Sequence, residues 1–189
     1  EQNASLIISG WKGFTTYKDN FFGTVIDSVA ARSHIPLLIA QFTQPVASTR
    51  RILLAVDKQQ VLSPNFAPTL EMSTAIAAEL KATLQVLIII PLRQKKFTTE
   101  ELTQLSPDIQ PEQAQGRLIN RISKRLQPED LLILEVNTRA RGLSTRQAAL
   151  GLVPEAITRT HPSISVLVMH YPPVTDKSLE KTVAVKAQV

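Results

Sequence analysis

The stretch Leu6-Ile7-Ile8-Ser9-Gly10-Trp11-Lys12-Gly13 is separated by nine residues from Gly23-Thr24-Val25-Ile26-Asp27-Ser28-Val29-Ala30. It begins with an apolar run typical of a buried strand and ends with the apolar spacing of a helix. The first turn of a helix has unpaired backbone N–H groups and partial positive charge. Glycines let the backbone approach a ligand closely, and Thr24 adds a hydroxyl. The stretch therefore predicts a phosphate-binding loop between a strand and a helix, in preference to a simple tight turn.

This order of elements occurs twice in the chain. Residues 5–42 read as a strand, a glycine loop, a helix and a second strand, and residues 131–170 read the same way. Short apolar strands that alternate with helices are typical of parallel sheets covered by helices on both faces. The predicted fold class is therefore α/β, with a doubly wound parallel sheet.

A new unit begins between the two copies, with an apolar strand that ends in Asp57. The elements predicted for this unit are a strand, a helix, a strand and a helix, at residues 52–57, 68–82, 84–90 and 112–126. Residues 93–111 are polar, contain two prolines and are predicted as a loop with one short helical turn. One strand–helix step of the unit stays unlocated in this loop.

Three segments follow from this pattern. Residues 1–45 form the second half of an α/β domain, residues 50–171 form one whole domain, and residues 172–189 form a flexible tail. Since position 1 is not methionine, we expect the chain to be a fragment of a longer polypeptide that holds the missing half. An isolated strand–helix–strand cannot bury both faces of its strands. We expect it to pack on the following domain, to extend its sheet, or to pair with another copy of the chain.

The pattern Gly-x2-Gly-x9-Gly-Thr at residues 10–24 resembles, without a gap, the nucleotide loop of the universal stress protein family. The resemblance implies a Rossmann-like fold of the universal stress type and a site for ATP or AMP. The glycines and the threonine would contact phosphate, the lysine would help electrostatically, and the aspartate would approach the adenine. The nucleotide-binding residues implied in this way are Gly10, Lys12, Gly13, Gly23, Thr24 and Asp57.

The corresponding loop of the second copy departs from the family pattern. When Leu6–Ser9 is aligned with Leu131–Leu134, Glu135 takes the place of Gly10. A carboxylate at this position would repel phosphate oxygens. We therefore expect the second unit not to bind ATP in the manner of the family, which leaves Asp57 as either a nucleotide contact or a strand-end residue.

Composition narrows the function classes. The chain has 189 residues, no cysteine and a formal net charge of +5, so disulfide and thiolate chemistry is excluded and anionic partners are favoured. Its longest apolar run is about half of what spans a bilayer, which predicts a soluble protein. The three histidines lack a neighbouring acid, a nucleophile pattern and metal-ligand spacing. We expect neither an enzyme nor, without a matching motif, a nucleic-acid-binding protein.

Residues 7–29 also resemble the cytoplasmic C-terminal region of bacterial cation/proton antiporters of the sodium–proton exchanger type. That resemblance implies a homodimeric regulatory domain on the cytoplasmic side of the membrane, which senses nucleotide and acts on the parent antiporter. Two alternatives stay open. One is a stand-alone tandem universal stress protein that binds ATP or AMP, and the other is a structural dimerisation module with a relic loop. No cofactor other than ATP or AMP is expected.

Overall fold

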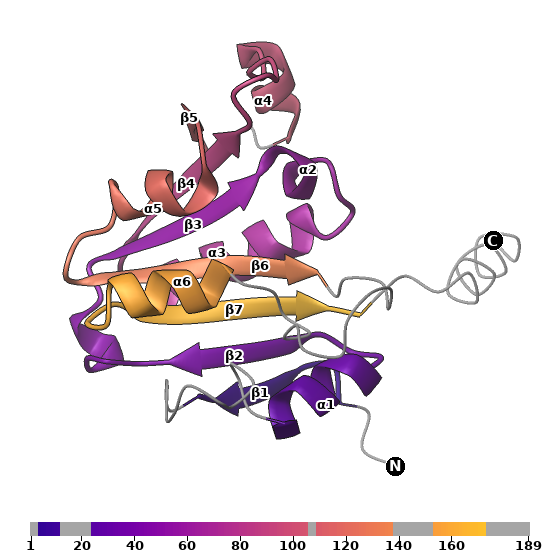
Figure 1. Ribbon diagram of the computed structural model, residues 1–189, viewed down its shortest axis with the longest axis vertical. Helices are drawn as coiled ribbons and strands as arrows, with labels where there is room; N and C mark the ends of the chain where they lie inside the picture. The colour runs from indigo at the N-terminus through magenta and orange to yellow at the C-terminus, as the bar shows by residue number, and fades with distance from the viewer. Residues whose placement is uncertain (1–3, 12–23, 106–108, 138–152, 173–189) are drawn as a thin grey trace, which may run out of the picture.

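The computed structural model describes residues 4–11, 24–105, 109–137 and 153–172. They form a seven-stranded sheet with helices on both faces (Figure 1). The strands are β1 (Ile7–Gly10), β2 (Leu37–Gln41), β3 (Arg51–Asp57), β4 (Thr83–Ile90), β5 (Glu112–Gln115), β6 (Asp130–Asn137) and β7 (Ser165–Tyr171). The helices are α1 (Thr24–Arg32), the 3-10 helix η1 (Val46–Ser48), α2 (Lys58–Val61), α3 (Phe66–Leu80), α4 (Thr99–Leu105), α5 (Leu118–Ser123) and α6 (Val153–Thr160).

Five strands make the parallel sheet that the sequence predicts. Their order is β5-β4-β3-β6-β7, and every neighbouring pair is parallel. The central strand β3 is buried throughout Ile52–Val56, because a parallel sheet with helices on both faces shields both sides of its strands. The predicted α/β fold class is confirmed.

The remaining two strands, β1 and β2, extend this sheet. β1 pairs parallel with β2, and β2 pairs antiparallel with β7. Of the arrangements expected for residues 1–45, the structure shows an extension of the following sheet. The antiparallel joint between β2 and β7 departs from the wholly parallel sheet that the repeat predicts, because two copies of one unit meet through the same strand.

The joint has a two-fold symmetric register. Its pairs are Leu37–His170, Leu38–Met169, Ile39–Val168, Ala40–Leu167 and Gln41–Val166. Leu37 and Val166 hold the same place in the two repeats, because each pairs with the equivalent residue of the strand before it. Exchanging the two repeats therefore reproduces the same set of pairs. The approximate two-fold axis passes between Ile39 and Val168, and it relates the β1–α1–β2 unit to the β6–α6–β7 unit.

The helices divide between the two faces of the sheet. α1, α5 and α6 contribute to the core on one face, and α2, α3 and α4 contribute to the core on the other. Among the described helices, none has the length and apolar character needed to cross a lipid bilayer. Both α1 and α6 lie on the same face, as the approximate two-fold axis requires.

Residues 112–126 differ from the single helix that their spacing predicts. β5 comes first, with Ala114 buried against the core, and α5 follows. Gly116 lies between them with a φ of 143°, a conformation that side-chain-bearing residues rarely adopt, so the chain changes direction there. Together with α4, β5 supplies the strand–helix step that the sequence leaves unlocated.

Candidate functional site

The predicted phosphate loop connects β1 to α1. Gly10 is the last residue of β1 and Thr24 is the first residue of α1, as the sequence predicts. The next residue after the strand, Trp11, is buried, and its N–H donates to the Ala40 carbonyl at 2.8 Å. This bond holds the start of the loop against the sheet. Three of the predicted contacts lie outside the described residues, namely Lys12, Gly13 and Gly23.

Gly10 faces open space at the carboxyl end of β1. A Cβ placed on it would meet no atom of the described residues within 4 Å, and the φ of Gly10 is not in the left-handed region. Neither packing nor backbone conformation therefore requires a glycine at this position. The open space leaves room for a ligand beside the strand, and it makes Gly10 a position where a side chain can be introduced without a clash.

Asp27 lies in the first turn of α1, after Thr24. Both of its carboxylate oxygens are buried without a hydrogen-bond partner in the described part of the chain. Burial raises the pKa of Asp27, because loss of water disfavours the charged form. A charged carboxylate here would repel a phosphate at the same helix end. The sequence alone did not single out Asp27, although an acid directly beside the buried Ile26 was a usable signal.

The second unit uses Asp57 in a different way. Asp57 ends β3 and caps α2: its Oδ1 accepts from the N–H groups of Gln59 and Gln60 at 2.8 and 2.9 Å. The Gln60 side chain accepts from the Asp57 N–H at 2.7 Å and donates to the Glu135 carbonyl at 2.6 Å. It therefore bridges the carboxyl ends of β3 and β6, the place where open α/β sheets commonly bind ligands.

Glu135, which takes the place of Gly10 in the second unit, is buried at 4% exposure. The Thr69 hydroxyl on α3 donates to its Oε2 at 3.0 Å and lies 3.1 Å from the Tyr171 hydroxyl. Burial raises the pKa of Tyr171. The hydrogen bond with Thr69 lowers this pKa, and the nearby charge of Glu135 raises it further. These buried contacts tie β6, β7 and α3 together and present a carboxylate where a phosphate would need donors. No local pattern indicates that Thr69 contacts Glu135 and Tyr171, since these residues are far apart along the chain.

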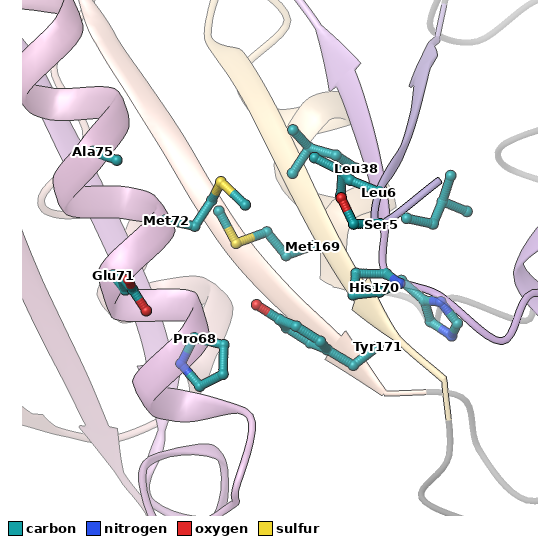
Figure 2. Close-up of a pocket in the computed structure, with 12 residues that line it drawn as sticks. Ser5, Leu6, Leu38, Pro68, Glu71, Met72, Ala75, Met169, His170 and Tyr171 are labelled. Atoms are coloured by element: carbon teal, nitrogen blue, oxygen red, sulfur yellow. The ribbon is translucent and has the colours of Figure 1, made fainter. Parts of the chain in front are cut away.

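A groove of about 670 Å³ lies over the joint between β2 and β7. Figure 2 shows Met72 and Glu71 of α3 on one side, Leu6 on the other, and Met169 and Tyr171 between them. Apolar side chains make most of its lining, and the groove opens on the face of the sheet that α3 covers elsewhere. None of the described residues that line it is among the predicted nucleotide-binding residues.

No family model and no curated protein matches this sequence. The structure, however, is similar to a universal stress protein from Archaeoglobus fulgidus DSM 4304, with a TM-score of 0.58 and 19% identity over 92% of this chain. The fold is that of universal stress proteins. A protein named for the same family from Pseudomonas aeruginosa UCBPP-PA14 and a protein of unknown function from Pseudomonas aeruginosa PAO1 match with TM-scores of 0.54 and 0.53, each at 19% identity over 88% of this chain. The chain spans 63% of the length of each of these structures.

Within this universal stress fold, the predicted residues that the structure describes fall into two groups, which lie at opposite ends of the strands. β7, β6 and β3 run in the same direction, whereas β2 and β1 run the other way. The carboxyl end of β1, with Gly10 and Thr24 near it, is therefore far from the carboxyl end of β3, where Asp57 lies. Three strands also separate β1 from β3. One chain brings Gly10 and Thr24 to the ends of a single loop, and it does not bring Asp57 to that loop.

Proposed function

We propose that this chain is a nucleotide-sensing regulatory module that binds ATP or AMP at the loop between β1 and α1. The observation that carries the proposal is the open carboxyl end of β1, where none of the described residues fills the space beside Gly10. The loop leads from there to Thr24 at the first turn of α1. Helix N-termini favour anions because their N–H groups are unpaired and the helix dipole is positive there.

The contrast with the second unit supports the choice of site. At the end of β6, a glutamine side chain and a buried carboxylate fill the corresponding place, through Gln60 and Glu135. Binding of a phosphate there would break the hydrogen bonds that join the ends of β3 and β6. We therefore assign nucleotide binding to the first unit alone.

For the biological role, we propose regulation of a membrane cation/proton antiporter from the cytoplasmic side, by a homodimer that responds to nucleotide. The support is the resemblance of residues 7–29 to the cytoplasmic C-terminal regions of such antiporters. A stand-alone protein that binds ATP or AMP is the second candidate, and the likeness to a universal stress protein from Archaeoglobus fulgidus favours it. The sequence encoded before Glu1 separates these two, since only the first requires a membrane domain there.

Calorimetry with ATP, AMP and cyclic dinucleotides tests the binding site. Gly10→Glu places in the first unit the carboxylate that Glu135 supplies in the second, and we expect it to abolish a saturable signal, as Gly23→Asp also should. Gly10→Ala is the matched control and should retain binding, because a Cβ there would meet no atom of the part of the chain that the structure describes. Light scattering in the same solutions reports whether nucleotide changes a dimer. The absence of a signal at millimolar nucleotide, with a folded chain, would contradict the proposal and favour a structural module.

A further inference from the structure

β1 lies at an open edge of the sheet. Among the described strands it has one neighbour, β2. The N–H groups of Ile7 and Trp11 donate to carbonyls of residues 36–40 at 2.9 and 2.8 Å. Because successive residues of a strand direct their N–H groups to opposite sides, those of Ile8 and Gly10 point to the open edge. Such an edge is a template for a further strand.

The side chain of Ile8 is exposed on the face of the sheet that α3 covers elsewhere. Ile8 is 69% exposed, whereas Ile133, which holds the same place in β6, is fully buried. Ile133 pairs with Leu54 of β3, and α3 packs on β3 and β4 over that face. Ile8 lies beside Leu38 on the same face, but no described strand or helix covers it from the outer side.

The groove over the joint continues this uncovered surface. Its walls are α3 on one side and Ser5 and Leu6, just before β1, on the other (Figure 2). Leu38 lies between them on β2. By the approximate two-fold axis, a helix equivalent to α3 would lie across β1 and close the groove from the open side.

We propose that the edge of β1 and the surface of Leu6, Ile8 and Leu38 bind a strand–helix segment of a partner polypeptide. Its strand, apolar like β3, would pair parallel to β1 through Ile8 and Gly10. Its helix, amphipathic like α3, would cover Ile8 and Leu38. The register of β2 and β7 defines this occupant, because exchanging the repeats places β3 beside β1 and α3 over Ile8.

A second copy of the chain is a poorer occupant. Its own β3 is enclosed between β4 and β6, so the copy cannot offer that strand without opening its sheet. The proposed segment is instead a free strand and helix, whose apolar side chains are not already buried.

Amide hydrogen exchange of the full 189-residue chain, with a synthetic peptide of residues 50–82 as the probe, tests the proposal. This peptide carries the sequences of β3, α2 and α3, which occupy the equivalent place beside β6. We expect the exchange of the Ile8 and Gly10 amides to slow by about tenfold or more on addition of the peptide, as amides do when they enter a β-ladder. A peptide of the same composition in scrambled order should have no effect.

The variant Ile8→Pro is the matched control on the chain. It removes an N–H that points to the open edge and keeps those that bond to β2, and edge strands tolerate proline at such positions. It should fold with an unchanged melting temperature and lose the effect of the peptide on Gly10. Unchanged exchange of Ile8 and Gly10 at the highest peptide concentration would overturn the proposal. So would protection of both amides in the chain alone together with a dimer mass, since a second copy would then cover the edge.

Discussion

The β6–α6–β7 unit and the β1–α1–β2 unit share one backbone plan and differ in what surrounds them. β6 lies inside the sheet between β3 and β7, whereas β1 lies at its edge. Isoleucine occupies the same place in both, and it is fully buried as Ile133 and 69% exposed as Ile8. An apolar strand therefore becomes core only when a neighbouring element is present to cover it. The same sequence pattern supplies either stability or a surface for binding.

The largest effect is expected for truncation of the two isoleucines. Ile133→Ala should lower the free energy of unfolding by about 3 kcal/mol, because it removes buried apolar area and leaves a cavity. Ile8→Ala should change it by less than about 0.5 kcal/mol, as exposed substitutions do. Urea unfolding of both variants, followed by circular dichroism, measures the difference. Equal losses would mean that β1 is covered in solution.

A smaller effect is expected at the carboxyl end of β6, where Glu135 replaces Gly10. Thr69→Val keeps the shape of the side chain and removes the hydroxyl that donates to the buried Glu135 carboxylate. We expect a loss of about 2 kcal/mol, because a buried charged group loses one of its donors. Thr74→Val on the same helix is the control, since the Thr74 hydroxyl donates to the Leu70 carbonyl in an exposed position. A loss at Thr74 as large as at Thr69 would show that helix propensity, not Glu135, is responsible.

The smallest effect concerns the acids that begin α1 and α6. The two carboxylate oxygens of Asp27 are buried without a hydrogen-bond partner among the described residues, whereas Glu155 pairs with Arg159 at 2.7 Å. Because burial raises the pKa of Asp27 in the folded state, the native protein binds a proton more readily than the unfolded chain. Stability should therefore fall as pH rises from 3.8 through the raised pKa.

Asp27→Asn should remove this pH dependence and raise the melting temperature at pH 7 by a few degrees. The gain should shrink as the pH falls, because the raised pKa of Asp27 favours the protonated, uncharged carboxyl at lower pH. Glu155→Gln should instead lower stability slightly, by about 0.4 kcal/mol, as for an exposed ion pair one turn apart on a helix. Melting curves from pH 4 to pH 7 measure both. A melting temperature for Asp27→Asn below that of the wild type at pH 7 would mean that the carboxylate has a favourable partner in solution.

Much of the fold could be predicted from the sequence because its strands are short apolar runs between helices. The repeat placed β1, α1 and β2 and their counterparts correctly, since both copies carry the same order of elements. β5 was missed because Glu112–Gln115 has three polar residues and one buried alanine. Its strand character comes from pairing with β4, which no local pattern contains. The antiparallel joint also depends on tertiary contact alone.

For the candidate site, the sequence located the strand end at Gly10 and the helix start at Thr24. It also indicated that Glu135 would not suit phosphate. The bridge from Gln60 to Glu135 could not be predicted, because it joins residues 75 positions apart through a side chain and a backbone carbonyl. Such contacts follow from the register of β3 and β6, which only the folded sheet defines.

The antiparallel joint has a consequence for the order of assembly. Beside it, the Thr43 N–H donates to the Ser165 hydroxyl, 122 positions away along the chain. Because contacts between residues so far apart in sequence form slowly, we expect this joint to form late in folding. After β3–β7 have folded, residues 42–50 alone tether the β1–α1–β2 unit, and it can detach without opening the larger sheet. Trp11, the single tryptophan of the chain, is buried in this unit. Its fluorescence should therefore change at a lower urea concentration than the circular dichroism of the whole chain. The unit that attaches last during folding would then be the first to detach during unfolding.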